Sequence, residues 1–154
     1  MSIVRVDDTD SAFVYTGSWQ RADGTNEFLG GAHGSRWQGG TADYTFTGTS
    51  IAVFGTLGNN STTDITSTYS IDGTRAGTFV QPHNGSTSYR QQMFRSGQLS
   101  SGEHTLHVRL DSQDAWYWLD YVEYIALAAT APSSSGSPTP TVAPAPSSSQ
   151  NSEP

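Results

Sequence analysis

Four aspartates are the residues whose type and spacing first suggest a chemistry. Asp7, Asp8 and Asp10 follow directly on the first expected strand, and Asp120 lies within the last one. Carboxylate oxygens are ligands that Ca²⁺ prefers, and closed antiparallel folds often bring the first and last strands together. The sequence therefore favours a structural calcium ion held by these aspartates. The alternative is that they cap turns and accept hydrogen bonds from the backbone.

Tryptophans in expected loops suggest a second chemistry, the binding of sugars. An indole ring can lie against the apolar side of a pyranose while planar polar side chains hold its hydroxyl groups. Trp37 and Trp116 are the stronger candidates for such a platform, and Trp19 is a third. The candidates for hydroxyl contacts are Asn84, Arg90, Gln92 and Asp114. Each of these polar residues can equally be an ordinary part of the surface.

Catalytic motifs are missing from the sequence, which has no Gly-x-Ser-x-Gly elbow, no His-Glu-x-x-His pair and no phosphate-binding loop. His104 and His107 are three residues apart on an expected strand, so their rings lie on opposite faces and cannot hold one metal ion. His33 and His83 are expected in loops, and there are 0 Cys. A pair among the 14 acidic residues could hydrolyse a glycosidic bond, but a lone sandwich seldom forms the necessary cleft. We therefore predict that the protein is not an enzyme.

The balance of charge argues against two classes of partner. Seven basic residues, all of them arginine, face 14 acidic residues and give a net charge of −7 at pH 7. Such a chain repels nucleic acids and anionic lipid surfaces. No apolar run approaches the roughly 18 residues of a membrane span, and the first residues do not read as a signal peptide. We expect a monomer that binds a glycan or a cell-wall polysaccharide, with membrane attachment only through a segment absent from this chain.

The elements that must position these residues are short antiparallel strands. Between residues 1 and 130, apolar and polar residues alternate, and clusters of Gly, Asn, Asp and Ser interrupt them. The pattern predicts an all-β antiparallel β-sandwich of about eight or nine strands, of the jelly-roll type if the first and last strands pair. The expected strands cover residues 3–6, 13–15, 41–47, 50–55, 65–71, 75–80, 89–95, 103–110 and 116–127.

Two local features refine this expectation. Asp72-Gly73 is typical of a tight hairpin turn, and Gly48-Thr49 marks a turn between two strands. Strict alternation along the last strand places Trp118 on the same face as Val122 and Tyr124, so we expect Trp118 in the core.

The last part of the chain has a different composition. Residues 131–154 hold six of the 7 Pro together with many Ser and Thr, which predicts a disordered Ser/Thr/Pro-rich stalk or linker. This composition suits O-glycosylation at a cell surface, and an unmodified disordered tail is the alternative. Sequons at Asn59, Asn60 and Asn84 are candidate N-glycosylation sites in expected loops.

Several motifs resemble a known fold family. The segments FTGTSIAVFG (46–55), YSIDG (69–73), GEHTL (102–106) and WLDYVEY (118–124) are similar to successive strands of galactose-binding-domain-like jelly rolls, among them carbohydrate-binding modules. VDDTD (6–10), YTGSW (15–19) and HG (33–34) more closely resemble ectodomains of single-pass membrane proteins of mushroom-forming fungi. The resemblance covers most of residues 1–126. It implies a calcium ion near the terminal strands and a stalk that precedes a membrane helix.

These observations leave three hypotheses. The first is a noncatalytic extracellular carbohydrate-binding-like module on a cell-surface stalk. The second is a structural or adhesive ectodomain that contacts other proteins and has no sugar site. The third, glycoside hydrolysis by a carboxylate pair, has the least support from the sequence.

Overall fold

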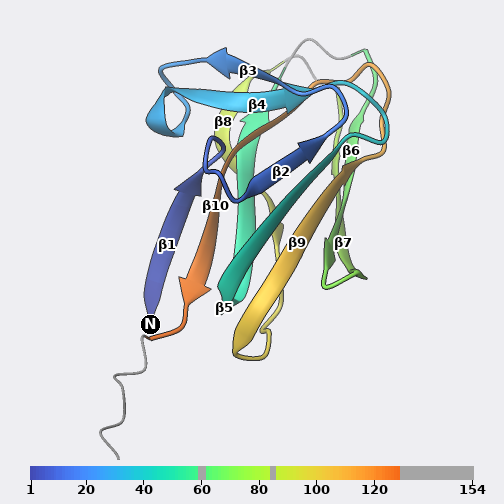
Figure 1. Ribbon diagram of the computed structural model, residues 1–154. Coiled ribbons are helices and arrows are strands. Elements are labelled where there is room, and N and C mark those ends of the chain that lie inside the picture. The colour runs from blue at the N-terminus through green and yellow to red at the C-terminus, as the bar shows by residue number, and fades with distance from the viewer. Residues whose placement is uncertain (59–61, 84–85, 129–154) are drawn as a thin grey trace, which may run out of the picture.

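The computed structural model describes residues 1–58, 62–83 and 86–128, which form an antiparallel all-β domain (Figure 1). Its only described helical element is one short 3-10 turn, η1 (Phe28–Gly30). The prediction of an all-β jelly roll is confirmed, with ten strands in place of eight or nine. They are β1 (Ser2–Asp7), β2 (Phe13–Thr16), β3 (Gln20–Asp23), β4 (Gly31–Ser35), β5 (Thr41–Leu57), β6 (Ile65–Ile71), β7 (Thr74–Gln81), β8 (Ser88–Arg95), β9 (Gly102–Leu110) and β10 (Tyr117–Ala126).

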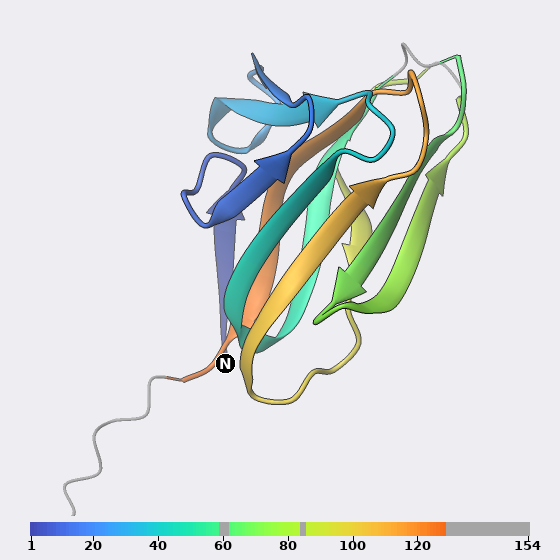
Figure 2. The same ribbon diagram turned by 45° about the vertical axis from the view of Figure 1, so that its right-hand side comes forward.

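The strands form two layers that β5 joins (Figure 2). The first half of β5 pairs with β2 and β9, and β9 continues to β6 and β7. Its second half pairs with β8 and β10, and β10 continues to β4 and β3. β1 pairs with the second half of β10, so the first and last strands are neighbours, as a jelly roll requires. β1 begins and β10 ends at the same pole of the domain (Figure 1).

The expected turn at Gly48-Thr49 is instead a bend within one strand. β5 keeps its ladder through this point, with Gly48 paired to both Gly102 and Ala126. A Cβ at Gly48 would lie 2.3 Å from the carbonyl oxygen of Ile125, so only glycine fits where the chain passes from one layer to the other. The 17-residue strand replaces two of the expected strands.

The core lies between the two layers and alternates along the strands. In β6 the odd-numbered residues from Ile65 to Ile71 are buried and the even-numbered ones are half-buried. Tyr69 stacks on Phe94 of the other layer at 4.6 Å between ring centroids and an angle of 2°. Its hydroxyl lies 3.0 Å from that of Tyr117, so the two layers share a polar contact inside the core.

The prediction that Trp118 lies in the core is wrong, because β10 contains a bulge. Leu119 pairs with Gly55 and Tyr121 with Phe54, so Asp120 is an extra residue in the strand. One extra residue exchanges the two faces of everything that follows it. Trp118 therefore lies on the face opposite to Val122, half-buried on the outside of the sheet instead of in the core.

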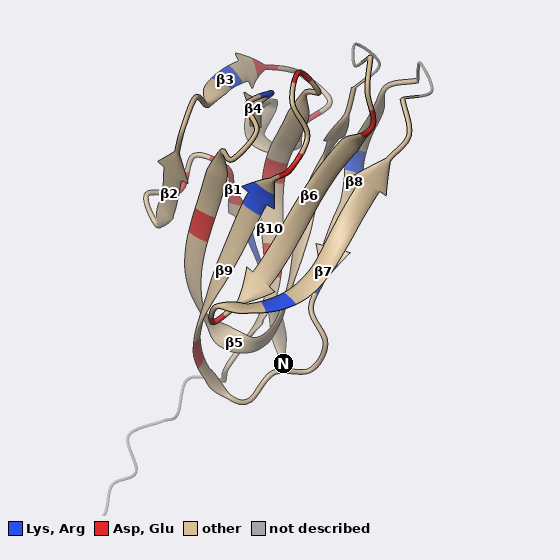
Figure 3. Ribbon diagram, turned by 90° about the vertical axis from the view of Figure 1, so that its right-hand side faces the viewer, with Lys and Arg blue, Asp and Glu red and all other residues tan. Residues whose placement is uncertain are grey.

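Charged residues are scattered over both layers. In Figure 3 the arginine segments are separated from one another, with no continuous basic band in that view. No helix among the described residues is long and apolar enough to cross a membrane.

Candidate functional site

Three buried carboxylates meet where the terminal strands run side by side. The register of β1 on β10 ends at Asp7↔Tyr121, and the backbone N–H of Asp8 donates to the carbonyl of Asp120 at 3.0 Å. This brings one carboxylate oxygen from each of Asp7, Asp8 and Asp120 within 4.8 Å of the others. The side chains of Asp8 and Asp120 are 0 % exposed. The β10 bulge makes this possible, since it turns Asp120 towards the cluster.

Half of the oxygens in this cluster have hydrogen bonds and half do not. Oδ2 of Asp7 accepts from the Thr9 hydroxyl, Oδ2 of Asp8 pairs with His33 Nδ1, and Oδ1 of Asp120 accepts from Phe28 N at 2.8 Å. The second oxygen of each carboxylate is shielded from solvent and has no partner among the described residues. Buried polar atoms are almost always satisfied, so three orphaned oxygens in one place fit a bound cation.

The electrostatics of the cluster agree with this interpretation. Burial raises the pKa of Asp8 to about 7, and the nearby charge of Asp7 adds to the effect. Burial likewise raises the pKa of Asp120 to about 7, against the hydrogen bond from Phe28. A hard divalent cation would remove this repulsion between carboxylates, and oxygen ligands of this kind suit Ca²⁺.

Asp10 and His33 are placed differently from expectation. Asp10 is exposed and lies outside the cluster, where its Oδ1 caps a turn by accepting from Ala12 N at 2.8 Å. His33 is on strand β4 instead of in a loop, because β4 pairs with both β3 and β10. Its ring stacks on Tyr15 at 4.5 Å and faces Asp8, and burial lowers its pKa. It orients one carboxylate of the cluster.

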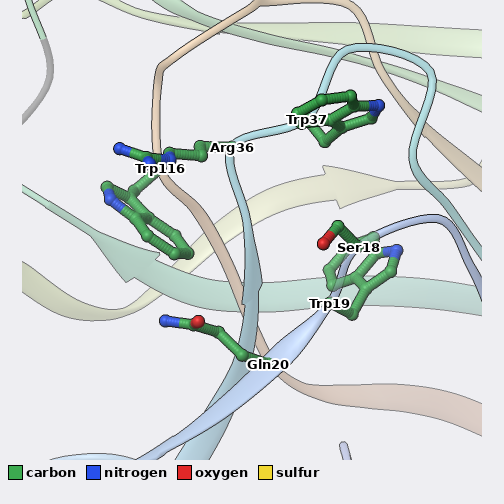
Figure 4. A pocket seen from close by; sticks show the side chains of 6 residues that line it. All are labelled: Ser18, Trp19, Gln20, Arg36, Trp37 and Trp116. Carbon is green, nitrogen blue, oxygen red and sulfur yellow. The ribbon is translucent and has the colours of Figure 1, made fainter.

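A second site lies among the loops at the pole opposite to the chain ends (Figures 1 and 4). Three loops enclose a cavity of about 260 Å³: the loop between β2 and β3, the loop between β4 and β5, and the segment before β10. All three tryptophans that the sequence suggested for sugar binding line it. The lining residues are Ser18, Trp19, Gln20, Arg36, Trp37 and Trp116.

The Trp19 wall of this cavity is held in place by its neighbours, and the Trp37 wall is more exposed. The Trp19 ring packs edge-on against Tyr117 at 6.3 Å, and its Nε1 donates to the Thr16 carbonyl at 3.1 Å. Trp37 is 58 % exposed, although its backbone N–H donates to Ser35 Oγ at 3.2 Å. A pre-positioned ring such as that of Trp19 loses little conformational entropy when a ligand arrives, which favours binding.

The third wall carries a charge. Arg36 places its guanidinium 5.6 Å from the ring of Trp116, and Trp116 stacks on Trp118 at 5.0 Å and 13°. The N–H of Asp114 donates to the Arg36 carbonyl at 2.9 Å, which ties this loop to the segment before β10. With the side-chain amide of Gln20, the cavity offers donors and an acceptor beside apolar ring faces. That combination suits a ligand with hydroxyl groups on one side and an apolar face on the other.

The other predicted polar residues that the structure describes, Arg90, Gln92 and Asp114, are not among the residues that line this cavity. Arg90 donates to the carbonyls of Asn26 and Glu27 at 2.9 and 3.3 Å and so fixes the loop before η1. Gln92 accepts from Arg95, and Asp114 contributes its backbone as described above. Asn84 lies outside the described residues, as do Asn59 and Asn60.

The remaining histidines have local carboxylate partners. His104 and His107 lie on opposite faces of β9, as predicted, and contact Asp72 and Asp43. His83 contacts Asp64 at 2.7 Å.

The polar residues that line the cavity are not among those predicted from the sequence. Ser18 and Gln20 flank Trp19, and Arg36 precedes Trp37, so adjacency to a candidate tryptophan was the available signal.

Comparison with known proteins shows the fold. No protein-family model and no curated protein sequence matches the chain. Among solved structures it is similar to a CBM35 from Cellvibrio japonicus Abf62, with a TM-score of 0.62 and 15 % identity over 79 % of this chain and 91 % of that one. It is similar to the CBM36-1 domain of a multidomain xylanase from the hindgut metagenome of Trinervitermes trinervoides, with a TM-score of 0.56 and 16 % identity over 79 % and 95 %.

A third similar structure is a larger enzyme. This is a family two carbohydrate esterase from Cellvibrio japonicus, with a TM-score of 0.58 and 12 % identity over 82 % of this chain. The chain spans about a third of that esterase, 34 % of its length. At these identities the comparisons establish that the chain has the fold of carbohydrate-binding modules.

Proposed function

We propose that this protein is a noncatalytic carbohydrate-binding module whose sugar site is the cavity of Trp19, Trp37 and Trp116. The observation that supports this most is the convergence of three tryptophans from three separate loops on one cavity. Trp37 is exposed and Trp19 and Trp116 are half-buried, and apolar side chains that gather in this way at a surface often mark a binding site. Arg36, Gln20 and Ser18 add groups that can bond to sugar hydroxyls.

The lining of the cavity favours binding over hydrolysis. A glycosidase needs two carboxyl groups facing each other across the bond that breaks. The described residues that line this cavity are three tryptophans, an arginine, a glutamine and a serine. We therefore propose a binding role for this cavity and assign it no reaction.

The cellular setting that we propose rests on the sequence. A Ser/Thr/Pro-rich segment at residues 131–154 suits a stalk, and the sequons at Asn59, Asn60 and Asn84 suit the secretory pathway. In this setting the module is extracellular and monomeric, and it binds a glycan or a cell-wall polysaccharide.

We also propose that Asp7, Asp8 and Asp120 hold a structural calcium ion. The support is twofold: each of these buried aspartates has one carboxylate oxygen without a partner among the described residues, and one carboxylate oxygen from each lies within 4.8 Å of the others. Bound there, the ion would neutralise these carboxylates and fix the pairing of β1 on β10.

The test of sugar binding is a glycan and polysaccharide panel with two matched variants. Trp37→Ala and Trp116→Ala should each weaken binding at least about tenfold, because each removes one ring face from the cavity. Val80→Ala removes an exposed apolar side chain on β7 and should bind like the wild type. A folded wild-type protein that binds nothing in the panel and self-associates in sedimentation would favour the adhesive ectodomain instead.

A further inference from the structure

A second cavity lies beside the tryptophan cavity. It has a volume of about 190 Å³ and belongs to the outer surface where β3, β4, β10 and β5 lie next to one another. Its lining combines one indole, one phenol and two carboxylates with small side chains. The lining residues are Ala22, Asp23, Glu27, Ala32, Thr56, Gly58, Thr87, Tyr89 and Trp118.

The strand register places both cavities on one face. In β3 and β4, Gln20 pairs with Gly34 and Ala22 pairs with Ala32, while Trp118 of β10 pairs with Gly34 from the other side. Directly paired residues of antiparallel strands point to the same face of the sheet. Gln20 lines the first cavity, whereas Ala22, Ala32 and Trp118 line the second. The two cavities therefore follow each other along one surface.

A stacked pair of indoles connects them. Trp116 belongs to the first cavity and Trp118 to the second, and their rings lie 5.0 Å apart at 13°. The pair can form because β4 has glycine at position 34. A Cβ there would lie 2.3 Å from ring atoms of Trp118, so the bare backbone lets the indole lie flat on the strand. The result is a continuous aromatic path between the cavities.

The second cavity also contains a carboxylate that can accept more hydrogen bonds than the fold supplies. Glu27 accepts one hydrogen bond among the described residues, from the Thr56 hydroxyl at 3.3 Å. Its Oε2 is shielded from solvent and has no partner among them. A carboxylate can accept about four hydrogen bonds, so a turn of the Glu27 side chain towards the cavity that it lines would let it accept hydroxyl groups of a ligand.

We propose that the second cavity is a further sugar subsite, so that the protein binds an internal stretch of a linear, uncharged glycan along the Trp116–Trp118 path. The proposal rests on the function proposed for the first cavity. Glu27 accepts hydroxyl groups of the sugar in the second subsite, and Trp118 provides its apolar floor. Asp23 is ion-paired with Arg21, so the negative charge of this subsite comes from Glu27, and it disfavours glycans made of carboxylated sugars.

The experiment titrates the full chain with oligosaccharides of increasing length. The probes are laminari-, nigero- and xylo-oligosaccharides from the dimer to the hexamer, with an oligogalacturonate hexamer as the anionic probe. Calorimetry gives the affinities. The four indole N–H signals in a ¹H–¹⁵N spectrum, assigned with Trp→Phe variants, report which tryptophans a probe reaches.

Two variants separate the second subsite from the first. Ala22→Tyr fills the second cavity from an exposed strand position, and Glu27→Gln keeps the shape of the side chain but removes its charge. We expect dimer affinity to stay unchanged in both and hexamer affinity to fall about tenfold. The Val80→Ala variant, at the far edge of the domain, should match the wild type with every probe.

The outcomes distinguish the two proposals. A dimer that shifts Trp37 and Trp116, and a hexamer that also shifts Trp118 and binds more tightly, would support the second subsite. Equal affinity for dimer and hexamer, or a hexamer affinity that Ala22→Tyr leaves intact, would overturn it while the first cavity stands as a sugar site. If no probe shifts any indole signal, the proposed function fails and the second subsite fails with it.

Discussion

Replacing Asp120 by Asn should have opposite effects on stability with and without calcium. Asn keeps Oδ1, which accepts from Phe28 N, and replaces Oδ2 by an N–H₂ group of the same size. With calcium the variant loses an anionic ligand and is destabilised. In chelator the new N–H₂ group can donate to a neighbouring carboxylate of the cluster and one of its charges is gone, so the variant is more stable than the wild type.

The expected magnitudes follow from the burial of this cluster. A ligand that binds only the folded state contributes about 2.7 kcal/mol when present at about 100 times its Kd. For a domain of this size that corresponds to roughly 10 °C in Tm. In chelator, satisfying buried acceptors that otherwise have no partner should stabilise Asp120→Asn by about 1–3 kcal/mol. Asp120→Asn should therefore be less stable than the wild type in Ca²⁺ and more stable than the wild type in chelator.

The assay is thermal and urea unfolding in Ca²⁺ and in EDTA at pH 7.5. Asp10→Asn is the matched control, since it removes the same charge close by in sequence, keeps its turn cap, and lies outside the cluster. It should respond to calcium like the wild type. A wild-type Tm that is the same in Ca²⁺ and EDTA would refute the calcium site. An Asp120→Asn variant that is less stable in both conditions would refute the claim that the calcium-free carboxylates repel.

Two further predictions concern the frame around the sites. Gly34→Ala should destabilise the domain by about 1–3 kcal/mol and weaken hexamer binding, because the added Cβ displaces Trp118. Urea unfolding measures the loss of stability and calorimetry measures the loss of affinity. An unchanged Trp118 indole signal in the variant would contradict this prediction. Both ring nitrogens of His104 face acceptors, Asp72 Oδ2 at 2.7 Å and the Ser100 carbonyl at 2.8 Å, so the folded state favours the protonated ring. The hydrogen bond to Asp72 raises the pKa of His104, and the same bond lowers the pKa of Asp72. The stability that His104 contributes is therefore present below about pH 6.5 and lost as pH rises through the folded pKa of His104. The stability that Asp72 contributes is present above about pH 4 and lost as pH falls through the folded pKa of Asp72. The difference in urea midpoint between wild type and His104→Gln should be largest from pH 4 to 6.5, and a difference that does not change with pH would contradict it.

Much of the sandwich follows from local patterns. Alternation from Ile65 to Ile71 and the Asp72-Gly73 dipeptide predicted the β6–β7 hairpin, and both turn residues have the positive φ that such a turn requires, 51° and 77°. The pairing of the first and last strands is also observed. The hairpin depends on neighbours in sequence, which is the information that a pattern carries, whereas the β1–β10 pairing was expected from the jelly-roll topology.

The parts that the sequence did not predict depend on contacts between distant segments. β4, with the sequence GAHGS, has little intrinsic tendency to be a strand and forms because β10 and β3 flank it. The bulge at Asp120 is invisible to alternation, so Trp118 was assigned to the wrong face. An aspartate between the apolar residues of an expected core strand was the available signal, since such a residue needs a local break in the ladder to find partners.

The position of the chain ends has a consequence for how the domain meets its surroundings. Ser2 and Ala126 lie opposite each other in the β1–β10 ladder, at the pole away from the tryptophan cavity (Figure 1). Whatever polypeptide joins the domain at either end leaves from that pole. An attached surface or neighbouring domain would lie on the side of that pole, and the tryptophan cavity would face away from it.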